Sequence, residues 1–273
     1  MSNLIRLVVN NYNEILEANK EIMVDSWPMM GSPGPMLCIV GTYLAFVLKI
    51  GPKMMEKRPA FQLNNLLIAY NAFQVLFSIW LTLLVSVVSR AAWWYFIAKI
   101  IELLDTVFFV LRKKQNQVTF LHVYHHTMTS VFSWCYLKFL PGEQGALLGF
   151  LNSFVHIVMY SYYLIAALGP QYRKYLWWKK YMTWIQLLQF VIMLGYLMTI
   201  LAMDCKVPKA LTYFFMTNVV IFIYLFGDFY RKAYKKKQHR HAAPIDSTDR
   251  LNTGSNGIGK GTTGRIGTIA ETG

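Results

Sequence analysis

The stretch that decides the fold class runs from residue 144 to residue 168 and reads QGALLGFLNSFVHIVMYSYYLIAAL. It contains no Asp, Glu, Lys or Arg, and it is longer than the ~20 apolar residues that cross a bilayer as one α-helix. It nevertheless contains Asn152 and His156, and polar or titratable side chains inside a membrane are costly and usually functional. The stretch therefore predicts a transmembrane helix that faces a buried polar chamber.

The remainder of the chain has the same character. Of 273 residues, 55% are hydrophobic and 16% aromatic, and only 15% are charged, against about 25% in ordinary soluble domains. Three cysteines without paired spacing indicate neither a disulfide framework nor a zinc site. The sequence predicts an all-α membrane protein with about seven spans: 34–51, 66–88, 91–111, 119–138, 144–168, 181–203 and 210–230.

The net charge of +14 does not indicate a nucleic-acid partner, because the basic residues are gathered between the spans. One face receives Lys49, Lys53, Lys57, Arg58, Arg112, Lys113, Lys114, Arg173, Lys174, Lys179, Lys180, Arg231, Lys232, Lys235, Lys236, Lys237 and Arg240. The opposite face receives only Arg6, Lys20, Arg90, Lys138, Lys206 and Lys209. The positive-inside rule then predicts a lumenal N-terminus and a cytosolic C-terminus.

The domain organisation follows from this topology. We predict a lumenal N-terminal segment over 1–33 and one seven-helix membrane domain over 34–230. The tail, 231–273, is predicted to be cytosolic, basic at first and then disordered, because its Gly, Ser and Thr residues bury too little apolar surface to offset the entropy of ordering.

Polar side chains recur at helical spacing in four of the predicted spans. In the fourth span His122, His125 and His126 fall at i, i+3 and i+4, which predicts one shared face. In the other three spans the stripes are Lys99, Glu102 and Asp105, then Asn152, His156, Tyr160 and Tyr163, then Thr183, Gln186 and Gln189. Lys99 and Glu102 are spaced to form an ion pair.

The polar side chains of the four spans are also predicted to lie at similar depths in the membrane. At a rise of 1.5 Å per residue, His125, Asp105 and Gln189 lie roughly 9–12 Å from the basic ends of their helices, and His156 roughly 20 Å. Four helices therefore bring polar groups to the cytosolic half or the middle of the membrane.

Several chemistries use histidines in this way. A di-iron oxygenase would need more nitrogen ligands than four intramembrane histidines supply, whereas a zinc hydrolase needs only three protein ligands. Without a metal, a neutral imidazole is a nucleophile or a general base for acyl transfer. Asn152, Gln186, Gln189 and a second histidine would supply donors to an oxyanion. Arg112, Lys113 and Lys114 suit the phosphates of coenzyme A. A seven-helix receptor or channel is the non-enzymatic alternative.

Four motifs resemble those of the very-long-chain fatty acid elongase family. Lys99-Ile-Ile-Glu102-Leu-Leu-Asp105-Thr106 is similar to its KxxExxDT motif, and His122-Val-Tyr-His125-His126 to its HxxHH box. Residues 152–163, from Asn152 to Tyr163, resemble NxxHxxMYxYY, and residues 183–189 resemble TxxQxxQ. The motifs keep the order and spacing of the family.

The resemblance implies a condensing enzyme of the endoplasmic reticulum with seven helices, six of them in a barrel around an acyl tunnel. Such enzymes join a long-chain acyl-CoA to malonyl-CoA and release CoA and carbon dioxide. Carried over to this chain, it implies catalytic roles for His125 and His156, with His122, His126, Asp105 and Asn152 beside them. Substrate binding is expected at Lys99, Glu102, Tyr160, Tyr163, Gln186, Gln189, Arg112, Lys113 and Lys114.

The expected partners follow from this reaction class. They are acyl-CoA, malonyl-CoA, membrane lipid, and the separate reductases and dehydratase that complete an elongation cycle, and a homodimer is left open. We expect no cofactor, no metal and no nucleic acid.

Overall fold

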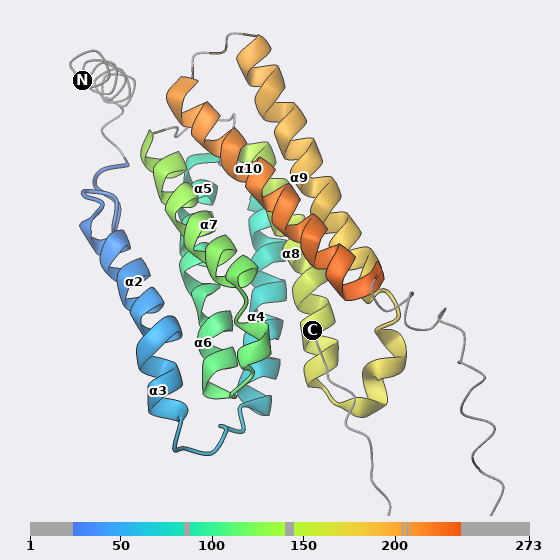
Figure 1. Ribbon diagram of the computed structural model, residues 1–273. Helices are drawn as coiled ribbons and strands as arrows, with labels where there is room; N and C mark the ends of the chain where they lie inside the picture. The colour runs from blue at the N-terminus through green and yellow to red at the C-terminus, as the bar shows by residue number, and fades with distance from the viewer. Residues whose placement is uncertain are drawn as a thin grey trace, which may run out of the picture.

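The computed structural model describes residues 24–84, 88–139, 145–203, 205, 207 and 209–235 (Figure 1). Over these residues the chain is helical and has no strand, so the predicted all-α class is confirmed. The elements are α2 (Gly34–Ala45), η1 (Phe46–Ile50), α3 (Gly51–Met55), α4 (Asn64–Leu83), α5 (Val88–Ile101), α6 (Leu103–Leu111), η3 (Gln115–Gln117), α7 (Phe120–Phe139), α8 (Ala146–Ala167), η5 (Pro170–Tyr175), α9 (Lys179–Ala202), α10 (Lys209–Tyr230) and η6 (Arg231–Lys235). Residues 1–23 and 236–273, which belong to the predicted lumenal segment and tail, lie outside the described residues.

Five helices of the described chain are long and apolar enough to cross a membrane. They are Gly34–Met55, Asn64–Leu83, Ala146–Ala167, Lys179–Ala202 and Lys209–Ala233. This makes the chain a multi-pass membrane protein by length and composition. Total span number and the six-helix barrel stay predictions.

The first span extends beyond its predicted end at residue 51. The Gly51 backbone N–H donates to Phe46 O, five residues back, which is the π-helical pattern. Pro52 follows and has no N–H to donate. The π-helical segment η1 accommodates this change in hydrogen bonding, and the helix continues as α3 to Met55.

The predicted third span, 91–111, is interrupted at Glu102. The Glu102 N–H still bonds to Ala98 O, four residues back, whereas the Asp105 N–H bonds to Glu102 O, three residues back. Glu102 keeps helical backbone angles, so one tighter turn joins α5 to α6. The fourth span, α7, has 20 residues, but its histidines lower its hydropathy.

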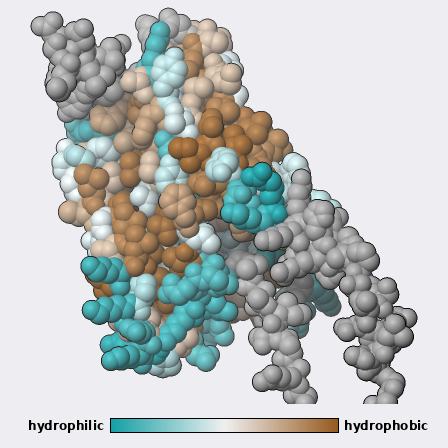
Figure 2. Space-filling model, in the orientation of Figure 1, coloured by the Kyte–Doolittle hydropathy of each residue, from teal (hydrophilic) through white to brown (hydrophobic). Residues whose placement is uncertain are grey.

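The helices pack as a bundle in which successive long helices reverse direction (Figure 1). The most extensive packing is between α4 and α8, between α9 and α10, and between α5 and α7. Large apolar side chains such as Leu76, Trp184 and Leu188 are exposed on the outside, as expected for a surface in lipid. Hydrophilic residues gather at the lower end of the view in Figure 2, where Lys57, Arg58 and Lys113 are exposed.

The segment before α2 packs against α5 and α7 near the opposite end of the bundle. The Trp93 indole N–H donates to Pro28 O over 3.2 Å, and the Trp134 indole N–H donates to Met29 O over 2.9 Å. Lys138 forms an ion pair with Asp25. These contacts fix residues 25–30 on α5 and α7.

Candidate active site

A cavity of about 150 Å³ lies inside the bundle and is lined by α4, α5, α7, α8, α9 and α10. Its walls are mainly apolar. On α7 the lining extends from His125 to Tyr136, which is roughly 16 Å along the helix axis at 1.5 Å per residue. An elongated apolar volume of this kind suits an aliphatic chain better than a compact polar ligand.

One end of this cavity is polar. His125 of α7, Asn152 of α8 and Gln189 of α9 all line it. The directions of the helices put these three residues at the same end, away from Tyr136 and Phe215 (Figure 1). The predicted convergence of polar groups from several helices is therefore observed for these three.

A second, smaller cavity of about 20 Å³ continues from the apolar end. Both cavities are lined by the same four residues, namely Tyr136, Leu148, Leu197 and Phe215. These side chains, which we call the apolar partition, separate the two volumes.

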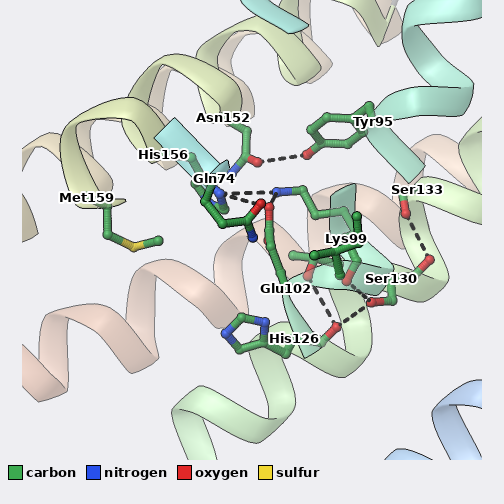
Figure 3. A network of polar contacts seen from close by, with 12 residues as sticks. Gln74, Tyr95, Lys99, Glu102, His126, Ser130, Ser133, Asn152, His156 and Met159 are labelled. Carbon is green, nitrogen blue, oxygen red and sulfur yellow. Dashed lines mark hydrogen bonds and ion pairs between the residues drawn. The ribbon is translucent and has the colours of Figure 1, made fainter. Parts of the chain in front are cut away.

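Behind the polar end lies a buried group of Lys99, Glu102 and His156, which we call the Lys99 cluster (Figure 3). Lys99 Nζ is 2.7 Å from Glu102 Oε1, so the predicted ion pair is present. His156 Nδ1 is 3.0 Å from the same oxygen and 3.4 Å from Lys99 Nζ. Each residue is at most 5% exposed. The Glu102 carboxylate thus contacts both the Lys99 ammonium and the His156 ring. The sequence predicted the first contact and not the second.

This cluster is tied to α7 through Ser130. The Ser130 hydroxyl lies 3.1 Å from Lys99 O and 2.9 Å from His126 O. It is completely buried. The Ser130 hydroxyl thereby links the main chain of α5 at Lys99 to that of α7 at His126.

Asp105 belongs to a different group. Its carboxylate accepts a hydrogen bond of 2.7 Å from the Tyr160 hydroxyl and lies 4.0 Å from His126 Nε2. The latter distance is longer than a hydrogen bond. The predicted orienting role of Asp105 for a histidine stays a prediction, and the histidine it approaches is His126.

The spacing predicted that the three histidines of α7 share one face, and each of His122 and His125 has its ring within 5.5 Å of that of His126, although the three meet different neighbouring helices. The rings of His122 and His126 are 4.4 Å apart, and His122 lies 5.2 Å from the Phe109 ring of α6. His125 instead lies 5.2 Å from the Phe222 ring of α10. Consecutive residues of a helix are about 100° apart, which is enough to put His125 against the cavity and His126 against α6.

The predicted glutamines make weak contacts. Gln186 Nε2 lies 3.7 Å from Met159 Sδ, and Gln189 Nε2 lies 3.8 Å from Met193 Sδ. Gln189 is buried, and its Oε1 is among the buried atoms without a hydrogen-bond partner. Because Gln189 lines the cavity, a ligand there would find an unpaired amide oxygen, with only a weak sulfur contact at the amide nitrogen.

Tyr163 and the basic residues belong neither to the Lys99 cluster nor to the group around Asp105. The Tyr163 ring is 6.1 Å from that of Tyr160. Arg112, Lys113 and Lys114 follow the end of α6, roughly 10 Å along the axis from Asp105. Lys113 donates to Glu56 O over 3.3 Å. These cations thus follow the end of α6 that lies at the lower end of the bundle in Figure 1.

Tyr95 is the cavity residue that the sequence analysis missed. Its hydroxyl donates to Asn152 Oδ1 over 3.0 Å, and Lys99 Nζ lies 4.8 Å from the centre of its ring. Tyr95 precedes Lys99 by one helical turn, so an extension of the stripe of Lys99 and Glu102 by four residues would have found it.

Over the described ranges, no group of three or more His, Cys, Asp or Glu side chains is arranged to hold a metal ion. This arrangement of side chains gives the zinc hydrolase no support. The prediction that the protein needs no metal and no cofactor stays a prediction.

Comparison with known proteins gives consistent matches over most of the chain. Residues 28–91 and 85–242 match the family described as ELO, the GNS1/SUR4 family. A protein of Aedes aegypti named very long chain fatty acid elongase is 38% identical over 89% of this chain and 75% of its own length. Human very long chain fatty acid elongase 4 is 40% identical over 87% of this chain and 82% of its own length.

A third relative, very long chain fatty acid elongase 7 of Drosophila melanogaster, is 37% identical over 89% of this chain and 82% of its own length. Such identities over nearly whole chains agree with the motifs and with the helical fold. The chain belongs to the ELO family.

Proposed function

We propose that this protein elongates fatty acids by condensing a long-chain acyl-CoA with malonyl-CoA to a 3-oxoacyl-CoA two carbons longer. The observation that carries the proposal is an elongated apolar cavity with His125, Asn152 and Gln189 at one end. The apolar walls accommodate the acyl chain, and the polar end holds its thioester. The names of the relatives, very long chain fatty acid elongases, support the same reaction.

His125 is proposed as the nucleophile. A ring nitrogen attacks the thioester carbonyl, the C–S bond breaks, and the departing CoA thiolate takes the proton that the acylated imidazole loses. Malonyl-CoA then loses carbon dioxide, and the resulting enolate carbon attacks the acyl-imidazole. The C–N bond breaks, and the departing imidazole takes a proton from water, which regenerates His125.

The groups around His125 are proposed to stabilise the charge that develops. Asn152 and Gln189 present amides to the cavity, and preorganised donors of this type stabilise an oxyanion. In the Lys99 cluster, the contact of His156 Nδ1 with Glu102 favours the tautomer with hydrogen on Nδ1. His156 Nε2 then remains as the nitrogen that takes a proton.

The remaining assignments follow from the reaction. Arg112, Lys113 and Lys114 are proposed to bind the phosphates of coenzyme A at the hydrophilic end. His122 and His126 are proposed to support the site or to bind the malonyl carboxylate. The protein is placed in the endoplasmic reticulum membrane with a cytosolic C-terminus.

The test is the intact mass of detergent-purified protein after incubation with a long-chain acyl-CoA alone. We expect an acyl adduct that maps to His125, is absent from His125→Ala, and disappears when malonyl-CoA is added. Cys135→Ala is the matched control, because Cys135 is a half-buried thiol on the same helix that does not line the cavity. It should still form the adduct.

The other outcomes are equally decisive. Product from both substrates without an adduct would replace the two-step route by direct displacement, with His125 as base. Full condensation by His125→Ala would overturn the assignment. Neither adduct nor product from the wild-type protein would overturn the proposed function itself.

A further inference from the structure

We infer that Tyr95 is a positioning residue that fixes the amide of Asn152 for the condensation reaction. The inference rests on the proposed function, because it concerns the oxyanion of that reaction. Neither the motifs nor the comparisons assign a role to Tyr95.

One hydrogen bond fixes which end of the Asn152 amide faces Tyr95. The Tyr95 hydroxyl has one hydrogen, and it lies 3.0 Å from Asn152 Oδ1 (Figure 3). With Oδ1 accepting that hydrogen, the other end of the amide, Nδ2, provides two donors. Both residues line the cavity at its polar end. The bond from Tyr95 therefore leaves the N–H groups of Asn152 Nδ2 as the donors of this amide.

Without the bond from Tyr95, the Asn152 amide would have two orientations. An amide can rotate by 180° and exchange its oxygen and nitrogen. An oxygen pointed at a developing oxyanion repels it, whereas N–H groups stabilise it. In the structure the Tyr95 hydroxyl donates to the oxygen, which holds the amide in the catalytically useful orientation before the substrate arrives.

Tyr95 is itself held in place by Lys99. Lys99 Nζ lies 4.8 Å from the centre of its ring, and a cation at this distance from an aromatic face is attracted to it. The same ammonium pairs with Glu102. Tyr95 thus connects Lys99 to Asn152, and neither of the motifs that hold these two residues contains it.

Tyr95→Phe tests this inference because it removes the hydroxyl and keeps the ring. We expect the kcat of condensation, measured per folded enzyme, to fall by about 10- to 100-fold. We expect KM for acyl-CoA to stay within about twofold, since the apolar walls are unchanged. A residue that serves only stability would lower the yield of folded enzyme and leave its kcat unchanged.

Tyr124→Phe is the matched control. The Tyr124 hydroxyl donates to Asn218 Oδ1 over 2.8 Å, which is the same chemical pair between two helices, and neither residue lines the cavity. We expect this variant to lose a similar amount of thermal stability and to keep its kcat.

A double variant distinguishes action through Asn152 from an independent effect. If Tyr95 acts through Asn152, Tyr95→Phe should cost nothing further in kcat once Asn152→Ala is present. Multiplication of the two losses would overturn the inference, and so would a Tyr95→Phe kcat equal to that of the wild type. Failure of the wild-type protein to form 3-oxoacyl-CoA would instead overturn the proposed function.

Discussion

At the scale of single residues, the Lys99 cluster places charge where solvation is poor. Lys99 and Glu102 are 2% and 3% exposed, so each depends on the other for compensation of its charge. Loss of one member of such a pair costs about 3–5 kcal/mol, whereas replacement of both by apolar groups costs much less. The pair is therefore testable by substitution.

We expect Glu102→Gln to lower the thermal unfolding temperature in detergent strongly, since it leaves the Lys99 ammonium buried without a counter-ion. The double variant Lys99→Met/Glu102→Leu should recover part of the loss. Asp228→Asn is the matched control: Asp228 pairs with exposed Arg231 and Lys232, so its loss should cost less than about 1 kcal/mol. A double variant no more stable than Glu102→Gln would contradict this account.

The residue types of the site were predictable, but their partners were only partly so. The spacing of Lys99 and Glu102 predicted an ion pair that is present. The contact of Glu102 with His156 joins residues more than 50 positions apart, and it depends on how α8 is rotated against the junction of α5 and α6. Tyr95 escaped notice because tyrosines are frequent in this chain, and only packing reveals which one meets Asn152.

At the scale of elements, the π-helical segment η1 places Gly51 against α6. A Cβ at Gly51 would lie 2.7 Å from Val110 Cγ1 and 2.8 Å from Phe46 O. The second contact is with backbone, which cannot move aside cheaply. The absence of a side chain at Gly51 therefore permits the close packing of α3 and α6.

Gly51→Ala should destabilise the protein by about 1–3 kcal/mol, because overpacking forces the backbone to shift. Gly41→Ala is the matched control on α2, since a Cβ there would meet nothing within 4 Å. That variant should be neutral or slightly more stable, as alanine favours helix by up to about 1 kcal/mol. Thermal unfolding of both variants in one detergent provides the measurement, and equal unfolding temperatures would refute the packing account.

The helices themselves were largely predictable from the sequence, and their irregularities were not. Long apolar runs predicted α4, α8, α9 and α10 to within a few residues. The interruption at Glu102 was missed because hydropathy averages over it. The shared-face pattern did not indicate which neighbouring helix each histidine of α7 meets, namely α6 for His122 and α10 for His125.

At the scale of the whole molecule, the basic end and the end where residues 25–30 pack against α5 and α7 define the predicted orientation. Lys57 and Ser32 are exposed at these two ends. The positive-inside rule predicts that the first faces the cytosol and the second the lumen.

Labelling of introduced thiols in sealed microsomes tests this orientation. In a background without Cys38, Cys135 and Cys205, we expect Lys57→Cys to react with a membrane-impermeant maleimide. Ser32→Cys should react only after permeabilisation. The reverse pattern would contradict the predicted topology, and equal reaction of both in sealed vesicles would point to leakage, which a lumenal marker protein reveals.

The apolar partition has a consequence for the reaction as a whole. Because Tyr136, Leu148, Leu197 and Phe215 separate two volumes, an acyl chain either ends before this layer or must displace it. Acceptance of longer chains would then change at a threshold instead of declining gradually. Truncation of a single member, such as Leu197→Ala, should merge the two volumes. The longest acyl chain that is accepted should then increase by the two carbons of one elongation round.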